Sequence, residues 1–242
     1  MVRISAVQMP VADSLEDNLA KITPYMEAAR GSDIVCFPET SLTGESRLPY
    51  TEVEAAVKSV GDRARSLGMW SIVGGYARRG NKIFNELYVV NRDGDLAYTY
   101  RKKHLWKDEK GITPGKTNRV VATDFGTIGV INCWDIRYPL ETLRLAQEGA
   151  DMVFCPAYWY KKYGTSEALG AMAHAAAFQN QIYFVLCDAY SEETAAESRI
   201  WSPLGTLAKA ERKECIISAD INLTDLKELR KTFDCYPGKS QK

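Results

Sequence analysis

The sequence lacks long hydrophobic runs and has no excess of charge of either sign. None of its apolar stretches approaches the roughly 18 residues that a membrane-spanning helix needs, and the segment Met1–Pro10 reads as a short strand instead of a signal peptide. Lys and Arg together number 31, as do Asp and Glu, so no net field draws the protein to nucleic acid or to an anionic membrane. We expect a cytoplasmic protein that binds neither.

Histidine is scarce, and the cysteines are scattered. The two histidines, His104 and His174, are far apart in the sequence, which argues against a metal pair and against a cysteine hydrolase that uses histidine as its base. The six cysteines include no Cys-x-x-Cys pair, so neither a zinc site nor a redox motif is indicated. Most of them lie in apolar, strand-like runs and read as small buried side chains.

The composition is that of a globular protein. Hydrophobic residues make up 45% of the chain and charged residues 26%, values that predict a packed core and leave no room for a disordered chain. We see no linker and expect one domain over residues 1–242.

Strand-like and helical patterns alternate along the sequence. Strands are predicted at 3–9, 33–37, 70–76, 83–90, 96–101, 120–123, 127–132, 151–155, 182–187 and 215–221, with a hairpin around Pro203–Gly205. Helices are predicted at 17–29, in a stretch ending near 67, and at 139–150, 166–180 and 223–231. Hairpins and strand-helix units together favour an α/β protein with mixed sheets covered by helices.

Two segments of the chain resemble each other. Val35-Cys-Phe-Pro-Glu39 and Val153-Phe-Cys-Pro156 are apolar strands that end at proline, each after a helix and a Gly/Ala-x-Asp start. The similarity suggests a pseudo-two-fold duplication, although it is short enough to arise by coincidence.

Three reactive side chains follow predicted strands. Glu39, Lys102 and Cys133 each stand where a strand meets a loop, a place where a side chain is held stiffly with its tip open to a ligand. Each alone has an ordinary structural interpretation. Together they supply a carboxylate base, an ammonium cation and a thiol, the groups that covalent catalysis by cysteine needs.

The motifs around these residues resemble those of the nitrilase superfamily of carbon–nitrogen hydrolases. Phe37–Thr40, Tyr100–Leu105 and Gly129–Pro139 match in order and spacing, and weaker matches extend from Ile4–Gln8 to Ser198–Gly205. The resemblance implies a four-layer αββα sandwich with two mixed β-sheets and no metal or organic cofactor. It implies Glu39 as base, Lys102 as cation and Cys133 as nucleophile.

Those roles are chemically consistent. Glu39 would take the thiol proton and later activate the water that hydrolyses the thioester. Lys102 would bind the oxyanion together with the backbone N–H of Trp134. Family members often have a second glutamate after the lysine motif, and Glu109 resembles it, with Asp108 as an adjacent competitor.

Specificity is less clearly indicated. Arg137 could hold a substrate carboxylate, or it could pair with an internal carboxylate such as Asp135 or Glu141 and stiffen the loop. Tyr158 and Trp159, near the predicted catalytic edge, could line a substrate pocket or cover the core.

We interpret the chain as an amidohydrolase that cleaves a small linear amide through a cysteine thioester. Hydrolysis of an N-carbamoyl amine, of an N-carbamoyl amino acid or of a nitrile is the alternative; nitrilases that resemble this chain usually extend further beyond the position of Tyr236–Gly238. A catalytically silent binding protein is the non-enzymatic alternative. In the resembling family the region of the alanine-rich helix at 166–180 often helps to form a dimer, so a homodimer or higher homo-oligomer is expected.

Overall fold

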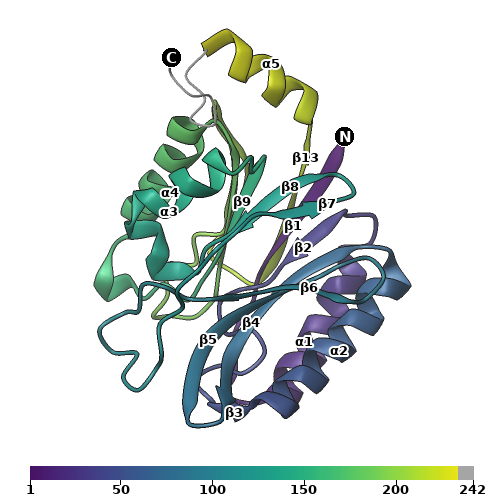
Figure 1. Ribbon diagram of the computed structural model, residues 1–242, viewed down its shortest axis with the longest axis vertical. Coiled ribbons are helices and arrows are strands. Elements are labelled where there is room, and N and C mark those ends of the chain that lie inside the picture. Colours follow the sequence, from purple (N-terminus) through teal and green to yellow (C-terminus); the bar gives the residue numbers. More distant parts are fainter. Residues whose placement is uncertain (234–242) are drawn as a thin grey trace.

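The computed structural model describes residues 1–233, so Cys235 and the segment at 236–238 lie outside the described residues. Strands and helices alternate along the chain as predicted (Figure 1). The strands are β1 Val2–Gln8, β2 Ile34–Cys36, β3 Leu48–Pro49, β4 Trp70–Arg79, β5 Lys82–Val90, β6 Leu96–Arg101, β7 Val121–Thr123, β8 Gly126–Val130, β9 Met152–Ala157, β10 Tyr183–Asp188, β11 Arg199–Ser202, β12 Gly205–Lys209 and β13 Cys215–Ile221. The helices are α1 Leu15–Ala28, α2 Tyr50–Leu67, α3 Pro139–Gln147, α4 Ser166–Asn180 and α5 Leu223–Phe233, with 3-10 helices at Cys133–Arg137 and Lys161–Tyr163.

The strands form two mixed sheets. The first has the order β13-β1-β2-β4-β5-β6, with the short β3 beside β4, and the second has the order β12-β11-β10-β9-β8-β7. The sheets lie face to face, with α1 and α2 on the outer side of the first and α3 and α4 on the outer side of the second (Figure 1). This arrangement confirms the predicted αββα sandwich.

Alternation of side chains along the strands produces the layers. In β2, Ile34 and Cys36 point into the core between the sheets, whereas Val35 points to the core beneath α1 and α2. In β9, Phe154 faces the first sheet and Val153 faces α3 and α4. Both faces of these central strands are buried, which explains why their sequences are continuously apolar.

The two sheets repeat one pattern of strand pairing. Starting from β13, the five successive pairs of the first sheet are antiparallel, parallel, parallel, antiparallel and antiparallel; starting from β7, the second sheet gives the same series. The registers agree as well, because Ile4 pairs with Ile34 in the way that Ile128 pairs with Met152. The topology therefore supports the duplication that the sequence suggests.

Some features differ from the sequence-based expectations. The two-residue strand β3 and the two 3-10 helices are not predicted, because such short elements have no recognisable period. Helix α3 ends at Gln147, before the predicted Ala150. Among residues 1–233, no helix is both long enough and apolar enough to cross a membrane.

Candidate active site

Glu39 stands three residues beyond the end of β2. Pro38, which has no backbone N–H, ends the ladder of the strand, and Thr40 follows with a left-handed φ of 52°. The turn is closed by Gly44, whose N–H donates to the Thr40 carbonyl (2.8 Å). A Cβ at Gly44 would lie 2.3 Å from the carbonyl oxygen of Ala12, so only glycine fits here. The carboxylate is thereby fixed at the edge of the sheet.

Lys102 immediately follows β6. Its N–H donates to the Asn85 carbonyl (2.9 Å), and its own carbonyl accepts from the N–H of Gly115 (2.8 Å). The side chain is 2% exposed. Its Nζ lies 2.7 Å from Oε1 of Glu39 and 2.9 Å from Oε2 of Glu109, so one ammonium stands between two carboxylates.

Cys133 begins the 3-10 helix that follows β8. Its φ is 48°, a left-handed value that is unfavourable for a residue with a side chain and is typical of functional turns. The turn is held by Asp135, which is fully buried and accepts from the backbone N–H groups of Asn132 (3.0 Å) and His104 (2.9 Å). The same carboxylate accepts from the Tyr100 hydroxyl (2.6 Å). Asp135 therefore ties the turn at Cys133 to the segment that bears Lys102.

Two buried asparagines connect the strands of the site. Asn132 donates from Nδ2 to Oδ1 of Asn85 (2.8 Å), and Asn85 donates from its own Nδ2 to Glu39 and to Glu109, at 2.8 Å each. These bonds link β8 and β5 to the loops that follow β2 and β6. The carboxylates are oriented by donors that cannot change their charge.

The electrostatics favour a protonated thiol beside a charged ion cluster. Burial raises the pKa of the Cys133 thiol well above its usual value; the charge of Glu39 adds to this rise and Lys102 opposes it. Burial disfavours the ammonium of Lys102, but nearby negative charge, that of Glu39 foremost, outweighs it and holds the pKa of Lys102 well above its ordinary value. Burial likewise acts to raise the pKa of Glu109, but Lys102 and the other donors lower it overall. The thiol therefore needs a base, and Glu39 is in contact with it.

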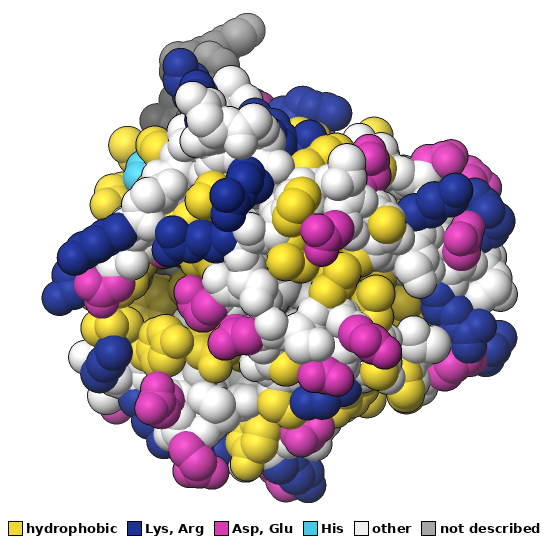
Figure 2. Space-filling view, turned by 90° about the horizontal axis from the view of Figure 1, so that it is seen from below, with side chains coloured by type: hydrophobic (Ala, Val, Ile, Leu, Met, Phe, Trp, Pro, Cys, Tyr) yellow, Lys and Arg dark blue, Asp and Glu magenta, His cyan; other side chains and the backbone are white. Residues whose placement is uncertain are grey.

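The cavity of the site, about 250 Å³ in volume, is lined by Glu39, Lys102, Glu109 and Cys133. Its walls are largely aromatic and include Trp134, Tyr158 and Trp159. The backbone N–H of Tyr158 donates to Oε2 of Glu39 (3.1 Å), and the rings of Trp134 and Trp159 stack at 5.5 Å. Seen from below, the molecule shows a hollow with hydrophobic walls and charged side chains nearby (Figure 2). Such a cavity suits a small ligand with one polar end at the ion cluster.

The structure brings together all but one of the residues singled out from the sequence. Glu109, and not Asp108, contacts Lys102; Asp108 instead accepts from the side chains of Trp106 (3.1 Å) and Tyr163 (3.1 Å) at the mouth of the cavity.

Arg137 is the exception. It is exposed, its guanidinium lies 4.7 Å from the centre of the Trp134 ring, and it is not among the residues that line the cavity. Glu141, one of its expected partners, pairs with Lys103 (2.6 Å) and His104 (3.1 Å). Arg137 lies four residues after Cys133 in the 3-10 helix, and with three residues per turn its side chain projects about 120° away from that of Cys133.

Sequence reasoning missed several polar residues of the site. Asn85 is the most important, since it contacts both carboxylates, and the Tyr76 hydroxyl also donates to Glu109 (3.2 Å). Asn85 interrupts an apolar strand, and a polar residue on a buried strand face is the signal that could have found it. Glu45 and Arg47, at the mouth of the cavity, follow the Glu39 turn and have no sequence signature.

Comparison with known proteins agrees with this geometry. A sequence model of the family described as carbon-nitrogen hydrolase matches residues 3–231. A probable nitrilase of Schizosaccharomyces pombe is 30% identical over 254 residues, which cover 95% of this chain and 92% of the relative. An omega-amidase of Xenopus tropicalis is 28% identical, and the match covers 94% of this chain and 91% of the relative.

Solved structures share the fold. A carbon-nitrogen hydrolase from Helicobacter pylori superposes with a TM-score of 0.88 at 20% identity, covering 98% of this chain and 94% of that one. A nitrilase-superfamily protein of Saccharomyces cerevisiae gives a TM-score of 0.85 at 22% identity, with 96% and 93% covered. The chain therefore belongs to the carbon–nitrogen hydrolase family of the nitrilase superfamily, and it is a hydrolase of carbon–nitrogen bonds other than peptide bonds.

Proposed function

We propose that the protein hydrolyses the terminal amide of a small linear substrate through a thioester on Cys133 and releases ammonia. The convergence of Glu39, Lys102 and Cys133 in one aromatic cavity is the observation that supports this most directly. The names of relatives add to it: omega-amidases of Xenopus tropicalis and Arabidopsis thaliana are 28% and 27% identical to the chain.

The proposed reaction has two stages. Glu39 accepts the thiol proton as Sγ attacks the amide carbon, and it returns that proton to the nitrogen as the C–N bond breaks. Glu39 then takes a proton from water, which attacks the thioester; the C–S bond breaks and the thiol is restored. Lys102 and the N–H of Trp134 stabilise the oxyanion in both stages. Glu109 keeps Lys102 charged and in place.

The cavity also suggests where specificity arises. Arg47 and Lys162 are exposed cations at its mouth, so we propose that the far end of the substrate lies there, as the carboxylate of an ω-amide would. Tyr158 and Trp159 form the wall along the chain of the substrate.

A substrate panel tests the proposal. We expect ammonia from small aliphatic amides and, with the highest kcat/KM, from ω-amides of dicarboxylates; carbamoyl amines, carbamoyl amino acids and nitriles complete the panel. The Cys133→Ala variant should lose all release, while Cys215→Ala, which removes a half-buried thiol on β13, should keep it. A preference for carbamoyl compounds or nitriles would change the substrate class.

Thiol chemistry separates an enzyme from a silent binding protein. Iodoacetamide should alkylate Cys133 at neutral pH, and the rate should fall in Glu39→Gln, because the base that deprotonates the buried thiol is gone. No ammonia from any substrate together with an unreactive Cys133 would contradict the proposed function.

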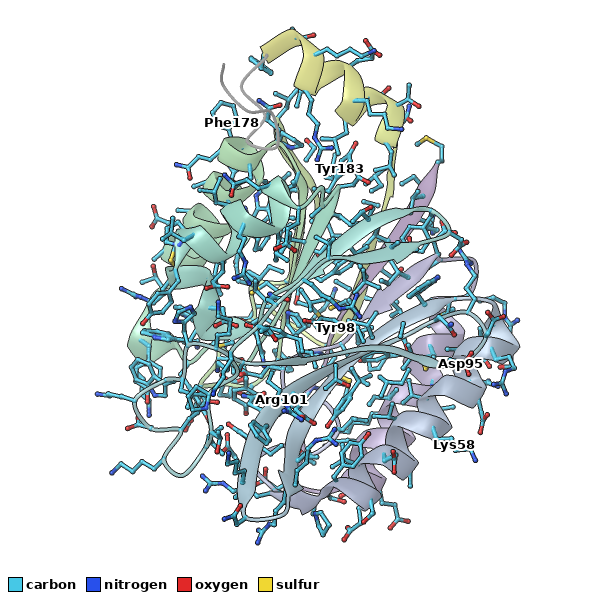
Figure 3. The ribbon with its side chains drawn as sticks, viewed as in Figure 1. Lys58, Asp95, Tyr98, Arg101, Phe178 and Tyr183 are labelled. Atoms are coloured by element: carbon cyan, nitrogen blue, oxygen red, sulfur yellow. The ribbon has the colours of Figure 1, made fainter. Side chains whose placement is uncertain are left out.

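We further propose a homodimer formed through α4. Phe178 on this helix is 57% exposed, and Leu140 at the start of α3 is 73% exposed; Phe178 lies near the C-terminal end of α4 (Figure 3). Light scattering should report a dimer that Phe178→Glu converts to a monomer, whereas Leu96→Glu on β6 should leave it intact. A cytoplasmic location stays a prediction, in keeping with the five described cysteines, all of which are free thiols.

A further inference from the structure

A second hollow, of about 530 Å³, lies at the β5–β6 edge of the first sheet. Four cationic side chains line it: Arg79, Lys82, Arg101 and Lys116. We call this hollow the basic groove. Arg101, the last residue of β6, pairs with Glu86 in the middle of β5, and it lies away from Lys58 on α2 (Figure 3).

One buried carboxylate holds the two arginines in place. Glu86 is fully buried, and its Oε1 lies 3.1 Å from Nε of Arg79 and 2.8 Å from Nε of Arg101. Because both nitrogens contact the same oxygen, the guanidinium groups lie side by side. Aromatic rings support them: Arg79 lies 3.2 Å from the centre of the Tyr50 ring, and Arg101 lies 4.2 Å from that of Phe84. The pair is thus preorganised instead of being free on the surface.

The charges of the groove do not balance. Glu86 neutralises one of the two guanidinium charges, and within residues 1–233 the structure shows no ion pair for Lys82 or Lys116. Helix α2 begins at Tyr50, which also lines the groove, so the positive end of its dipole lies on the same side. The groove therefore has about three positive charges in excess and threonine hydroxyls among its lining residues.

The basic groove is separate from the substrate cavity. Asn85 points to the space between the sheets, where it meets Glu39, whereas Glu86, the next residue, points to the opposite face of the strand. On β6 and just beyond it, Lys102 likewise points to Glu39 between the sheets, whereas Arg101 points to Glu86 on the opposite face. Among residues 1–233, none lines both hollows.

We propose that the basic groove binds a phosphate-bearing small molecule, a phosphomonoester or a diphosphate. Paired guanidinium groups present N–H donors in the planar arrangement that matches phosphate oxygens, and the two lysines add charge for a ligand with more than one negative charge. This site is independent of the proposed amide hydrolysis.

Titration calorimetry with the full-length protein tests the proposal, with inorganic phosphate and inorganic diphosphate as probes at fixed ionic strength. We expect one diphosphate per chain, bound more tightly than phosphate. The Lys82→Ala/Lys116→Ala variant removes two exposed side chains, so it should fold, keep its basal hydrolytic activity and bind diphosphate at least about tenfold more weakly.

The matched control is Lys58→Ala/Lys227→Ala, which removes two exposed lysines of α2 and α5 and lowers the net charge equally. It should bind diphosphate within about twofold of the unmodified protein. Absence of saturable binding up to about 10 mM diphosphate, equal weakening in both variants, or unchanged binding in Lys82→Ala/Lys116→Ala would each overturn the proposal.

Discussion

The two halves of the molecule place different residues at equivalent positions. Ile4 and Ile34 correspond to Ile128 and Met152 by register. Five residues further along the chain in each case, Met9 corresponds to Cys133 and Glu39 to Ala157. Lys102 corresponds to Ala210, because each follows an equivalent strand pair and donates its N–H across it, to Asn85 and Ser198, at 2.9 Å.

The difference shows what the fold does not require. Met9, Ala157 and Ala210, which we call the Ala–Ala–Met cluster, are all buried and uncharged; the nearest acidic residue by register is Asp188, which is fully buried and pairs with Ala157. The fold therefore does not require the Glu–Lys–Cys cluster of Glu39, Lys102 and Cys133, since the same backbone closes without it. Each half contributes part of that cluster, the carboxylate and the ammonium from one and the thiol from the other.

The largest effect should come from replacing Lys102 with the residue at the equivalent position of the other half. Lys102→Ala, which copies Ala210, should lower kcat/KM by about 10²–10³ or more, because the proposed oxyanion donor is lost. It should also destabilise the protein by about 3 kcal/mol in urea unfolding, because two buried carboxylates remain without their cation. Lys103→Ala breaks a pair with Glu141 outside the cavity and serves as control; equal losses in both variants would contradict the assignment.

The reverse change, which introduces a carboxylate into the Ala–Ala–Met cluster, should destabilise the protein. Ala157→Glu places a carboxylate where the counterpart of Lys102 is an alanine, so it should be less stable than Ala157→Gln, a neutral change of similar volume, by about 2 kcal/mol at pH 7. Urea unfolding of the two variants gives the difference. Equal stability of Ala157→Glu and Ala157→Gln would mean that the Ala–Ala–Met cluster accommodates a buried carboxylate as well as the Glu–Lys–Cys cluster does.

A smaller effect is expected from the amide that orients both carboxylates. Asn85→Ser, which copies Ser198, should reduce kcat/KM about tenfold, because the donor to Glu39 and Glu109 is lost while the charges remain. Ser198→Ala, at the equivalent position, should stay within about twofold. Steady-state kinetics of the two variants on the best substrate show whether a side-chain donor at this position affects turnover only beside the Glu–Lys–Cys cluster.

The smallest effect concerns pH. The pKa of Glu109 lies below its ordinary value because Lys102 and the donors of Asn85 and Trp106 together outweigh the effect of burial. The contribution of Glu109 to stability is therefore present above pH 4.5 and is lost as the pH falls through the lowered pKa. The stability lost in Glu109→Gln should therefore be larger at pH 7 than near pH 3. A difference that grew on acidification would mean that the folded state prefers the neutral acid.

The sequence predicts the strand ends well and the loops poorly. Glu39, Lys102 and Cys133 each stand just beyond a predicted strand, so local pattern places them at strand ends, but their roles as base, cation and nucleophile rest on the family resemblance. The choice between Asp108 and Glu109 could not be made in that way, because the loop after Lys102 takes its shape from distant bonds such as that from the Thr113 N–H to the Ile83 carbonyl (2.7 Å).

Asn85 shows a second limit of sequence reasoning. The alternation of β5 indicates which face the side chain occupies, but its partners depend on the register of β5 with β4 and β6 and on the approach of the second sheet. Arg137 shows a third, since its direction depends on a one-turn helix that has no period in the sequence.

The left-handed backbone at Cys133 has a consequence for the way this enzyme can change. A glycine at that position would relieve backbone strain of about 1 kcal/mol and would abolish the thiol. Selection for heat resistance alone would thus favour a substitution that removes the proposed nucleophile, whereas selection for turnover would keep the strained cysteine. In a library of variants at position 133, selection for folding should rank glycine above cysteine, and selection for activity should rank cysteine above glycine.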